Sequence, residues 1–242
     1  MITSKKLLAT CLPVDTVRVF IGYDPVETVA WHVLAHSIIA RSSLPVAITP
    51  VNLRNIEHLF GREWDPKQSN EFSFSRFLVP YLCGYKGWAI FMDCDMLCVS
   101  DIAKLWALRD PDYTLSVVKN DHAVAPGQGV KYLGRPQTGY ARKNWSSLML
   151  LNNAACGKLT PDYVSTAHGL DLHQFKWVDG DDKIGPLPRS WNHLVGVSAP
   201  NKDAQLAHYT LGGPWFTECK DCEYSDRWRR ELEAMLRCDQ KS

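Results

Sequence analysis

The stretch that decides the fold reads Trp88-Ala89-Ile90-Phe91-Met92-Asp93-Cys94-Asp95-Met96-Leu97. Its apolar residues run without interruption into Asp93, a pattern typical of a strand that is buried on both faces. Open α/β sheets bind their ligands at the carboxyl ends of strands, which is where Asp93 and Asp95 would lie. Two carboxylates beside an apolar strand are costly unless a divalent cation pairs them. The stretch therefore predicts an α/β fold with a cation site. A strand that ends in a polar turn would give the same pattern, because an isolated Asp-x-Asp is weakly specific.

Length and composition indicate a globular chain. A chain of 242 residues forms one large domain or two small ones, and it is long enough to bury a substantial core. The net charge of +1 argues against a broad nucleic-acid-binding surface, and no stretch approaches the length of a membrane span. Residues 1–12 lack the long apolar region of a signal peptide. We therefore interpret residues 1–16 as a leader or a flank of the first strand, and we expect a cytoplasmic protein.

The eight cysteines are interpreted as unremarkable thiols. Cys219 and Cys222 form one C-x-x-C, but a zinc site would need a second pair or suitably spaced histidines, and none is evident. Cysteines inside apolar runs usually behave as small buried hydrophobic residues. Four cysteines lie in such runs: Cys83, Cys94, Cys98 and Cys156.

The first strand and helix are typical of the opening of a nucleotide-binding α/β unit. Residues 17–21 form an apolar strand, which Gly22-Tyr23-Asp24-Pro25 interrupts. Asp24 is a suitable N-cap for the helix that follows, with Pro25 in the first helical position. The loop has neither a G-x-G-x-x-G nor a Walker pattern, so neither dinucleotide nor P-loop binding is supported.

Arg76 is the lone cation in a predicted helix over residues 71–82 that packs beside the apolar strand. One interpretation is a surface arginine whose stem lies along apolar neighbours. The other is a contact to phosphate or to a carboxylate of the cation site, which suits a planar guanidinium.

Three polar stretches in the second half of the chain are candidates for function. Residues 120–144 form a long Gly-rich connection, and such a loop inside a compact domain is often functional. His208 lies in a predicted short strand over residues 206–210 and precedes Gly212-Gly213, where backbone amides can cradle phosphate, although a lone histidine more often simply packs. The third stretch is rich in acids, for which a solvated turn is an equally good interpretation: Asp179, Asp181 and Asp182.

Six motifs follow one another along the chain. They are Phe20-Ile21-Gly22-Tyr23-Asp24, Ser75-Arg76-Phe77, Phe91-Met92-Asp93-Cys94-Asp95, residues 145–152, the acid-rich stretch with Leu187-Pro188 and Trp191-Asn192, and residues 208–215. In this order they resemble the retaining glycosyltransferases of the GT-A fold, family 8-like. No single motif is specific, but six in order are hard to obtain by chance. The resemblance implies a GT-A fold, which is a Rossmann-like, mixed but mostly parallel sheet flanked by helices. It also implies a single domain over residues 1–242, with residues 217–242 as a C-terminal helical tail. Within this tail, the residues themselves predict a charged amphipathic helix over 225–237 with Ser225 as its N-cap.

The resemblance implies a set of binding residues. The metal ligands would be Asp93, Asp95 and His208, and the ion would be Mn²⁺, with Mg²⁺ as the alternative. Arg76 would lie near the donor sugar and the pyrophosphate. The other contacts to a nucleotide-sugar donor would come from Ile21, Gly22, Tyr23, Asp24, Cys94, Ser146, Ser147, Gly212 and Gly213.

The resemblance also implies catalytic residues. A carboxylate near the anomeric carbon would come from Asp179, Asp181 or Asp182. Asp181 is favoured because Gly180 lets the backbone turn before it. Arg76 is counted with these residues because of its expected place beside the pyrophosphate.

The activity implied is that of a hexosyltransferase. It would move a sugar from a nucleotide-sugar, with UDP as the expected nucleotide, to a saccharide or other hydroxyl acceptor, and it would retain the anomeric configuration. The chain departs from the family where Pro214-Trp215-Phe216 replaces a phosphate-contacting lysine and where Trp145-Ser146-Ser147 replaces the usual Asn-x-Gly. The first departure leaves the phosphate charge to metal and arginine, and the second weakens any inference about which sugar fits. A homo-oligomer stays open.

Three rival classes share features with this sequence. A haloacid-dehalogenase-like phosphatase also places Asp-x-Asp after an apolar strand, but its motif needs Thr or Val where Leu97 stands. A sugar-phosphate nucleotidyltransferase would have a Gly-rich, basic loop after the first strand, unlike residues 22–25. A catalytically idle module that binds sugar nucleotides would keep the fold, but both acids and His208 are present.

Overall fold

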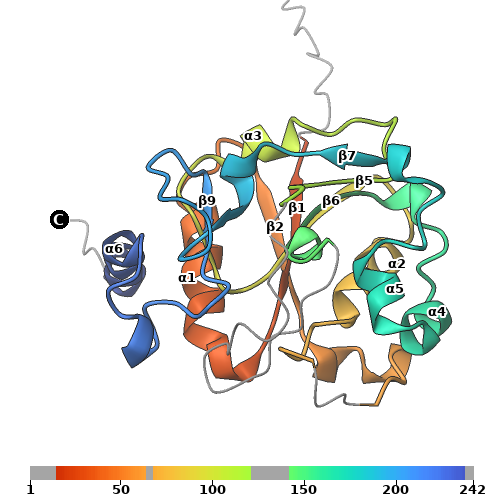
Figure 1. Cartoon of the computed structure of the whole chain (residues 1–242), viewed down its shortest axis with the longest axis horizontal. Helices are drawn as coiled ribbons and strands as arrows, with labels where there is room; N and C mark the ends of the chain where they lie inside the picture. The colour runs from red at the N-terminus through yellow and green to blue at the C-terminus, as the bar shows by residue number, and fades with distance from the viewer. Residues whose placement is uncertain (1–14, 64–67, 121–141, 238–242) are drawn as a thin grey trace, which may run out of the picture.

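The computed structural model describes residues 15–63, 68–120 and 142–237, and Figure 1 shows their arrangement. Among these residues, a six-stranded sheet has the strand order β2-β1-β3-β6-β5-β7. The strands are β1 (Val17–Gly22), β2 (Val46–Val51), β3 (Trp88–Met92), β5 (Leu115–Val117), β6 (Leu148–Asn152) and β7 (Ile184–Pro186). β6 is antiparallel to both of its neighbours, and the other pairs are parallel. This is the mixed, mostly parallel sheet that the sequence predicted.

β3 occupies an inner position of this sheet because its side chains are apolar on both faces. Ala89 through Met92 are fully buried, with β1 on one side and β6 on the other. The register places Met92 beside Ile21 of β1 and opposite Leu148 of β6. The chain after β3, the loop after β1 and the chain before β6 therefore meet at one edge of the sheet.

A smaller sheet continues from that edge. In the described part of the chain it has the order β4-β9-β8, formed by β4 (Met96–Cys98), β8 (His193–Leu194) and β9 (Leu206–His208). β4 and β9 are antiparallel, with Met96 opposite His208. Beyond this pair the Tyr209 backbone N–H donates to the Asp95 carbonyl at 2.8 Å. The smaller sheet thus joins the two segments of the chain that carry the candidate metal ligands.

Helices lie on both sides of the larger sheet, with α1 and α6 on one side and α2, α4 and α5 on the other (Figure 1). They are α1 (Thr28–Ile39), α2 (Val79–Leu82), α3 (Ile102–Trp106), α4 (Pro161–Thr166), α5 (Gly169–His173) and α6 (Ser225–Leu236). The predicted cap before α1 is confirmed: the Asp24 carboxylate accepts from the Val26 backbone N–H at 3.0 Å. The helix opens there as a single 3-10 turn, η1 (Pro25–Glu27). Among the described residues, no helix has the length and apolar character that a bilayer crossing requires.

The helix predicted over residues 71–82 is shorter in the structure. A turn leads into the 3-10 helix η4 (Ser75–Leu78) and then into the single turn of α2. Pro80 has no N–H to bond the Arg76 carbonyl four residues earlier, and that carbonyl accepts from Val79 instead. The proline therefore favours the tighter 3-10 winding in which Arg76 lies.

α6 packs against α1 and the smaller sheet, but its start differs from the N-cap that Ser225 suggests by residue type. Tyr224 takes the N-cap position in a left-handed conformation, with φ of 65° and no side-chain cap bond, and Ser225 is the first helical residue. The apolar cluster beneath α6 contains Val33, Leu97, Val195, Ala207, Tyr209 and Trp228.

Three of the four cysteines predicted to be buried are buried: Cys94, Cys98 and Cys156. Cys83 is partly exposed, because it follows the end of α2. The strand predicted over residues 206–210 ends at His208. Most of the predicted leader and of the Gly-rich connection, residues 1–14 and 121–141, lie outside the described residues.

Candidate active site

Asp93, Asp95 and His208 converge at the carboxyl end of β3. One ligand atom of each lies within 4.8 Å of the others, and all three residues are buried. His208 Nε2 is 3.4 Å from Asp95 Oδ1. Backbone pairing fixes this geometry, because the Asp93 N–H donates to the Ser147 carbonyl at 2.9 Å and β4 aligns with β9 directly after Asp95.

The donor set of this group can hold a metal ion. Oxygen ligands suit Mg²⁺, Ca²⁺ and Mn²⁺, and imidazole is a common ligand of transition metals. Asp93 and Asp95 are each only 7% exposed, so their carboxylates have lost much of their hydration. A divalent cation would offset the repulsion between them. The sequence predicted these three residues as one group, and the structure brings them together.

Arg76 contacts the first of these carboxylates. Its Nη1 atom lies 2.7 Å from Asp93 Oδ1 and 3.0 Å from the Ser146 carbonyl, and its Nε donates to the Phe72 carbonyl at 3.2 Å. The guanidinium also lies 5.2 Å from the ring centre of Phe72 and 5.1 Å from that of Phe91. Arg76 is 4% exposed, so the interpretation as a surface arginine is wrong.

Asn192 orients the imidazole of His208. The Asn192 Nδ2 atom donates to the Asn144 carbonyl at 3.2 Å and to Ser147 Oγ at 2.9 Å. Its Oδ1 atom therefore faces His208 Nδ1, at 2.9 Å, and accepts the Nδ1 proton. The lone pair of His208 is left on Nε2, which is the atom beside Asp95. The Trp191-Asn192 motif marked this residue in the sequence, but no role was assigned to it there.

The first loop lies beside this group because Ile21 and Met92 are register partners. Its turn is held by Asp24, whose carboxylate also accepts from the Glu71 backbone N–H at 3.3 Å. Gly22 passes so close to Phe72 that an added Cβ would lie 2.3 Å from the ring. The Tyr23 hydroxyl is 3.1 Å from Thr28 Oγ1, which fixes its ring against α1. The four predicted loop residues are thus contiguous with the carboxylate pair.

Two predicted pocket residues precede β6. Ser146 and Ser147 are buried in the 3-10 helix η6 (Trp145–Ser147). Ser146 Oγ is 2.8 Å from His173 Nδ1, a contact that the sequence gave no reason to expect. Ser147 Oγ donates to the Asn144 carbonyl at 2.7 Å.

Cys94 lies between the two acids and points into the protein. Its thiol contacts a carboxylate oxygen of Glu27 at 3.7 Å. Burial, followed by the nearby Glu27 carboxylate, raises the pKa of the Cys94 thiol well above its usual range. The Cys94 side chain therefore stays a neutral thiol at neutral pH.

The turn after β9 contains both predicted glycines. Gly212 has a backbone φ of 110°, a conformation that residues other than glycine rarely adopt. An added Cβ on Gly213 would lie 2.1 Å from the ring of Trp215. Both glycines are therefore required by the shape of this turn, whatever it binds.

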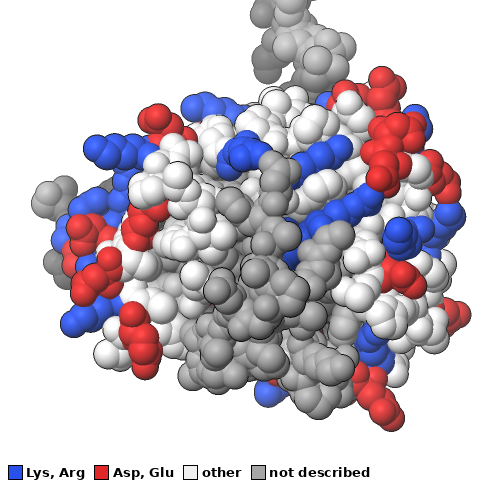
Figure 2. All heavy atoms as spheres, in the orientation of Figure 1, with Lys and Arg blue, Asp and Glu red and all other residues white. Residues whose placement is uncertain are grey.

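The three acids lie elsewhere on the surface. Asp181 and Asp182 begin the 3-10 helix η8 (Asp181–Lys183), and the Asp179 and Asp181 side chains are 82% and 80% exposed. Asp181 pairs with Arg142, whose hydrogen bond lowers the pKa of the carboxyl, and Asp179 pairs with Lys158. Figure 2 shows acidic and basic side chains lying next to one another over much of the visible surface. Among the described residues, no contact joins these acids to the carboxylate pair, so their catalytic role stays a prediction.

Solved structures of low sequence identity share the fold of this chain. The bifunctional glycosyltransferase WbbM matches 93% of this chain at 16% identity, with a TM-score of 0.63, and the chain spans 50% of its length. The glycosyltransferase GlyE of Streptococcus pneumoniae TIGR4 matches 92% at 15% identity, with a TM-score of 0.60, and the chain spans 62% of its length. An active-site mutant of LgtC matches 93% at 12% identity, with a TM-score of 0.56 over 98% of that chain. The fold is therefore the GT-A fold that the motifs predicted.

A sequence relative defines the family. Protein CDI of Arabidopsis thaliana is 44% identical over 228 residues, which cover 89% of this chain and 86% of the relative. The chain belongs to the family of that protein. No protein-family model matches the chain.

Proposed function

We propose that the protein is a metal-dependent, retaining glycosyltransferase of the family 8 type that acts as a hexosyltransferase. It takes a sugar from a nucleotide-linked donor, with UDP as the nucleotide, and transfers it to a saccharide or another hydroxyl group. The observation that carries this proposal is the convergence of Asp93, Asp95 and His208 beside Arg76 at the end of β3. The fold supports it, since LgtC, solved in complex with donor and acceptor sugar analogues, matches 93% of this chain with a TM-score of 0.53.

The metal ligands are Asp93, Asp95 and His208, with Mn²⁺ as the ion and Mg²⁺ as the alternative. A bound divalent cation stabilises, as a Lewis acid, the negative charge that develops on a leaving diphosphate. Arg76 fixes Asp93 in place and adds positive charge beside the diphosphate. This matters because Pro214-Trp215-Phe216 supplies no cation after the glycine turn.

The donor lies along the edge that the first loop, η6 and the glycine turn share. The first loop binds the base and ribose, η6 binds the sugar, and backbone amides of the turn bind phosphate. These roles fall on Ile21, Gly22, Tyr23, Asp24, Cys94, Ser146, Ser147, Gly212 and Gly213.

A mixture of the protein, Mn²⁺ and a panel of sugar nucleotides tests the proposal. Nucleoside diphosphate should be released, and the release should stop in excess EDTA and in Asp95→Ala. A matched control is Asp203→Ala, which removes an exposed carboxylate and should leave turnover unchanged. If the protein is instead given a nucleoside triphosphate and a sugar phosphate, release of inorganic pyrophosphate would identify a nucleotidyltransferase. Tight UDP binding without turnover of any donor would identify an idle binding module.

Among the acids, we propose that Asp181 positions the acceptor and stabilises positive charge on the sugar ring. Asp181→Ala should then keep donor and Mn²⁺ binding while transfer falls by about a hundredfold, the scale of a lost electrostatic stabiliser. Calorimetric donor affinity and transfer rate should be measured for Asp179→Ala, Asp181→Ala and Asp182→Ala in parallel. If none of the three slows transfer, the stretch is a solvated turn.

A further inference from the structure

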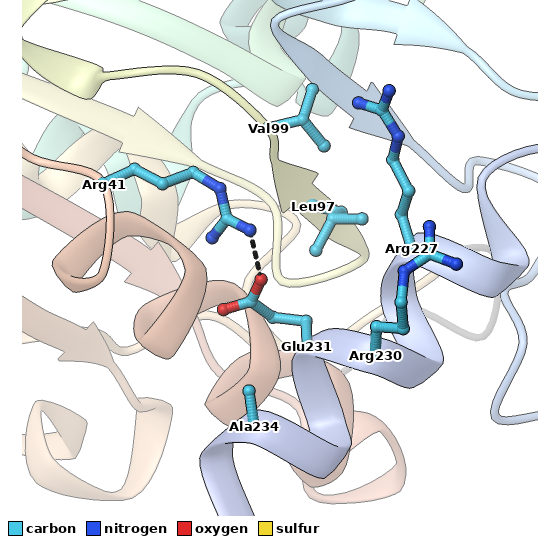
Figure 3. A pocket seen from close by; sticks show the side chains of 7 residues that line it. All are labelled: Arg41, Leu97, Val99, Arg227, Arg230, Glu231 and Ala234. Atoms are coloured by element: carbon cyan, nitrogen blue, oxygen red, sulfur yellow. Dashed lines mark hydrogen bonds and ion pairs between the residues drawn. The ribbon is translucent and has the colours of Figure 1, made fainter.

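A second concave site lies between α1, β4 and α6 (Figure 3). Its volume is about 350 Å³. Its wall carries basic side chains from α6 and from the turn after α1, and its floor is apolar. The residues that line it are Arg41, Leu97, Val99, Arg227, Arg230, Glu231 and Ala234. None of them belongs to the proposed active site.

The carboxylate in this pocket is already neutralised. Glu231 is buried and pairs with Arg41 at 2.5 Å and with His36 Nδ1 at 2.6 Å. Figure 3 shows Arg41 reaching across from the α1 side to this carboxylate. The charges of Arg41 and Glu231 therefore cancel, and the net positive charge of the pocket comes from the remaining arginines.

Arg227 and Arg230 supply that charge. Both are exposed, and neither has a carboxylate partner within 4.0 Å among the described residues. Arg227 lies 5.5 Å from the ring centre of Tyr224, a contact that leaves its N–H groups available. Like charges three residues apart on a helix repel each other, so a bound anion would relieve an unfavourable interaction.

Arg229 shows that this arrangement is particular to one face of α6. It points away from the pocket face, because residues 227, 230, 231 and 234 share a stripe of the helix and 229 does not. Its guanidinium pairs with Asp226 at 2.9 Å and Asp221 at 3.6 Å. Of the three arginines in α6, Arg229 is therefore paired with carboxylates. Arg227 and Arg230, which face the pocket, have no carboxylate partner among the described residues.

The floor of the pocket is apolar and firmly packed. Leu97 is 1% exposed and anchored in the cluster beneath α6, and Val99 donates its backbone N–H to the Gln205 carbonyl at 3.0 Å. The floor therefore offers no free backbone donor, and specificity comes from the guanidinium groups. Planar guanidinium forks match phosphate oxygens in a bidentate manner, better than an ammonium group does.

We propose that this pocket is a second binding site, for a phosphate-bearing anion, held by Arg227 and Arg230. The site is independent of the proposed transferase activity, which uses other residues. A free phosphate compound and a phosphoinositide headgroup carry the same recognised group, so the experiment must separate the two sources.

The test titrates inorganic pyrophosphate into the full chain at low salt, in EDTA, so that a metal at Asp93 and Asp95 cannot contribute. Backbone amide NMR signals locate the binding. In the wild type, signals of Leu97, Val99 and Ala234 should shift. The double variant Arg227→Ala/Arg230→Ala should bind at least about tenfold more weakly, the effect of losing hydrogen bonds to a charged group. Arg229→Ala, the matched control, should change the dissociation constant less than twofold.

Co-sedimentation with phosphatidylcholine vesicles, with and without a phosphoinositide, separates the sources. If the wild type binds the phosphoinositide vesicles and the double variant does not, the ligand is a lipid headgroup. If the wild type binds pyrophosphate but not these vesicles, the ligand is soluble. Circular dichroism should show that all variants are folded. The proposal is overturned if wild type and double variant bind both probes equally, or if the shifted signals cluster at Gly22 and Gly213 instead.

Discussion

At the scale of single residues, Asn192 orients His208, which is a candidate metal ligand, although Asn192 is not a candidate ligand itself. Its two amide hydrogens are taken by Asn144 and Ser147, so its oxygen can only face His208. That choice fixes the imidazole tautomer with the lone pair on Nε2. Partners of this kind typically change metal affinity by about 10–100-fold.

We therefore predict that Asn192→Ala binds Mn²⁺ about 10–100-fold more weakly than the wild type. Asn192→Asp keeps an acceptor for the Nδ1 proton and should retain more of the affinity. Mn²⁺ electron paramagnetic resonance measures both without reference to activity. Equal affinity in the wild type and both variants would refute the positioning role.

Arg76 leads to a second prediction at this scale. In Arg76→Lys a single ammonium cannot reproduce the bonds to Asp93, Ser146 and Phe72 together, so turnover should fall strongly while the chain stays folded. In Arg76→Ala the buried Asp93 carboxylate loses its ion pair with Arg76, and the free energy of unfolding should fall by about 3–5 kcal/mol. Urea unfolding and initial transfer rates distinguish the two effects. A folded Arg76→Lys with unchanged kinetics would remove Arg76 from the site.

At the scale of elements, strands with long apolar runs could be predicted, but the smaller sheet could not. β1, β3 and β6 were predictable because continuous burial leaves a continuous apolar run. A short strand was expected at β9, but β4 and β8 hold three and two residues, too few for any period to show, so the pairing of the three strands was not foreseen. The start of α6 was also misread, because a backbone conformation at Tyr224 replaces the side-chain cap that Ser225 suggests.

The contact between the first loop and the turn at Phe72 gives a prediction at this scale. Gly22→Ala would place Cβ 2.3 Å from the Phe72 ring, and Phe72 in turn supports Arg76. We expect a loss of about 1–3 kcal/mol in the free energy of unfolding, the usual cost of overpacking. Gly61→Ala is the control, since nothing lies within 4 Å of its added Cβ, and it should be close to neutral. Chemical denaturation of both variants measures the difference, and equal stability would show that Phe72 moves freely.

At the scale of the whole molecule, the candidate metal ligands could be predicted from the sequence, but how they meet could not. The Asp-x-Asp and His208 were predicted as one group only through a family resemblance, because spacing alone says nothing about residues so far apart. No sequence pattern predicted that His173 would lie beside Ser146. Its contact depends on how α5 packs against η6, which is a tertiary property. The acids around Asp181 form a prominent sequence pattern, but their described contacts are ion pairs on the surface.

The assembled metal site predicts a stability effect for the whole chain. We expect Mn²⁺ to bind the folded state through Asp93, Asp95 and His208, which the unfolded chain does not bring together, so it should raise the melting temperature. At a concentration 100 times the dissociation constant the gain is about 2.7 kcal/mol. His208→Ala should abolish the rise, while Asp203→Ala should keep it. Differential scanning calorimetry checks this, and an unchanged rise in His208→Ala would exclude the imidazole as a ligand.

The pairing of β4 with β9 also determines when a new chain becomes complete. Asp93 and Asp95 leave the ribosome early, with β3, but their third partner follows only after β5, β6 and β7 have been made. Contacts between such distant segments form slowly, because a long loop must close first. Until then Asp93 and Asp95 lack His208, so the proposed metal site has only two of its three ligands. For the proposed site, metal loading should therefore follow the pairing of β9 with β4.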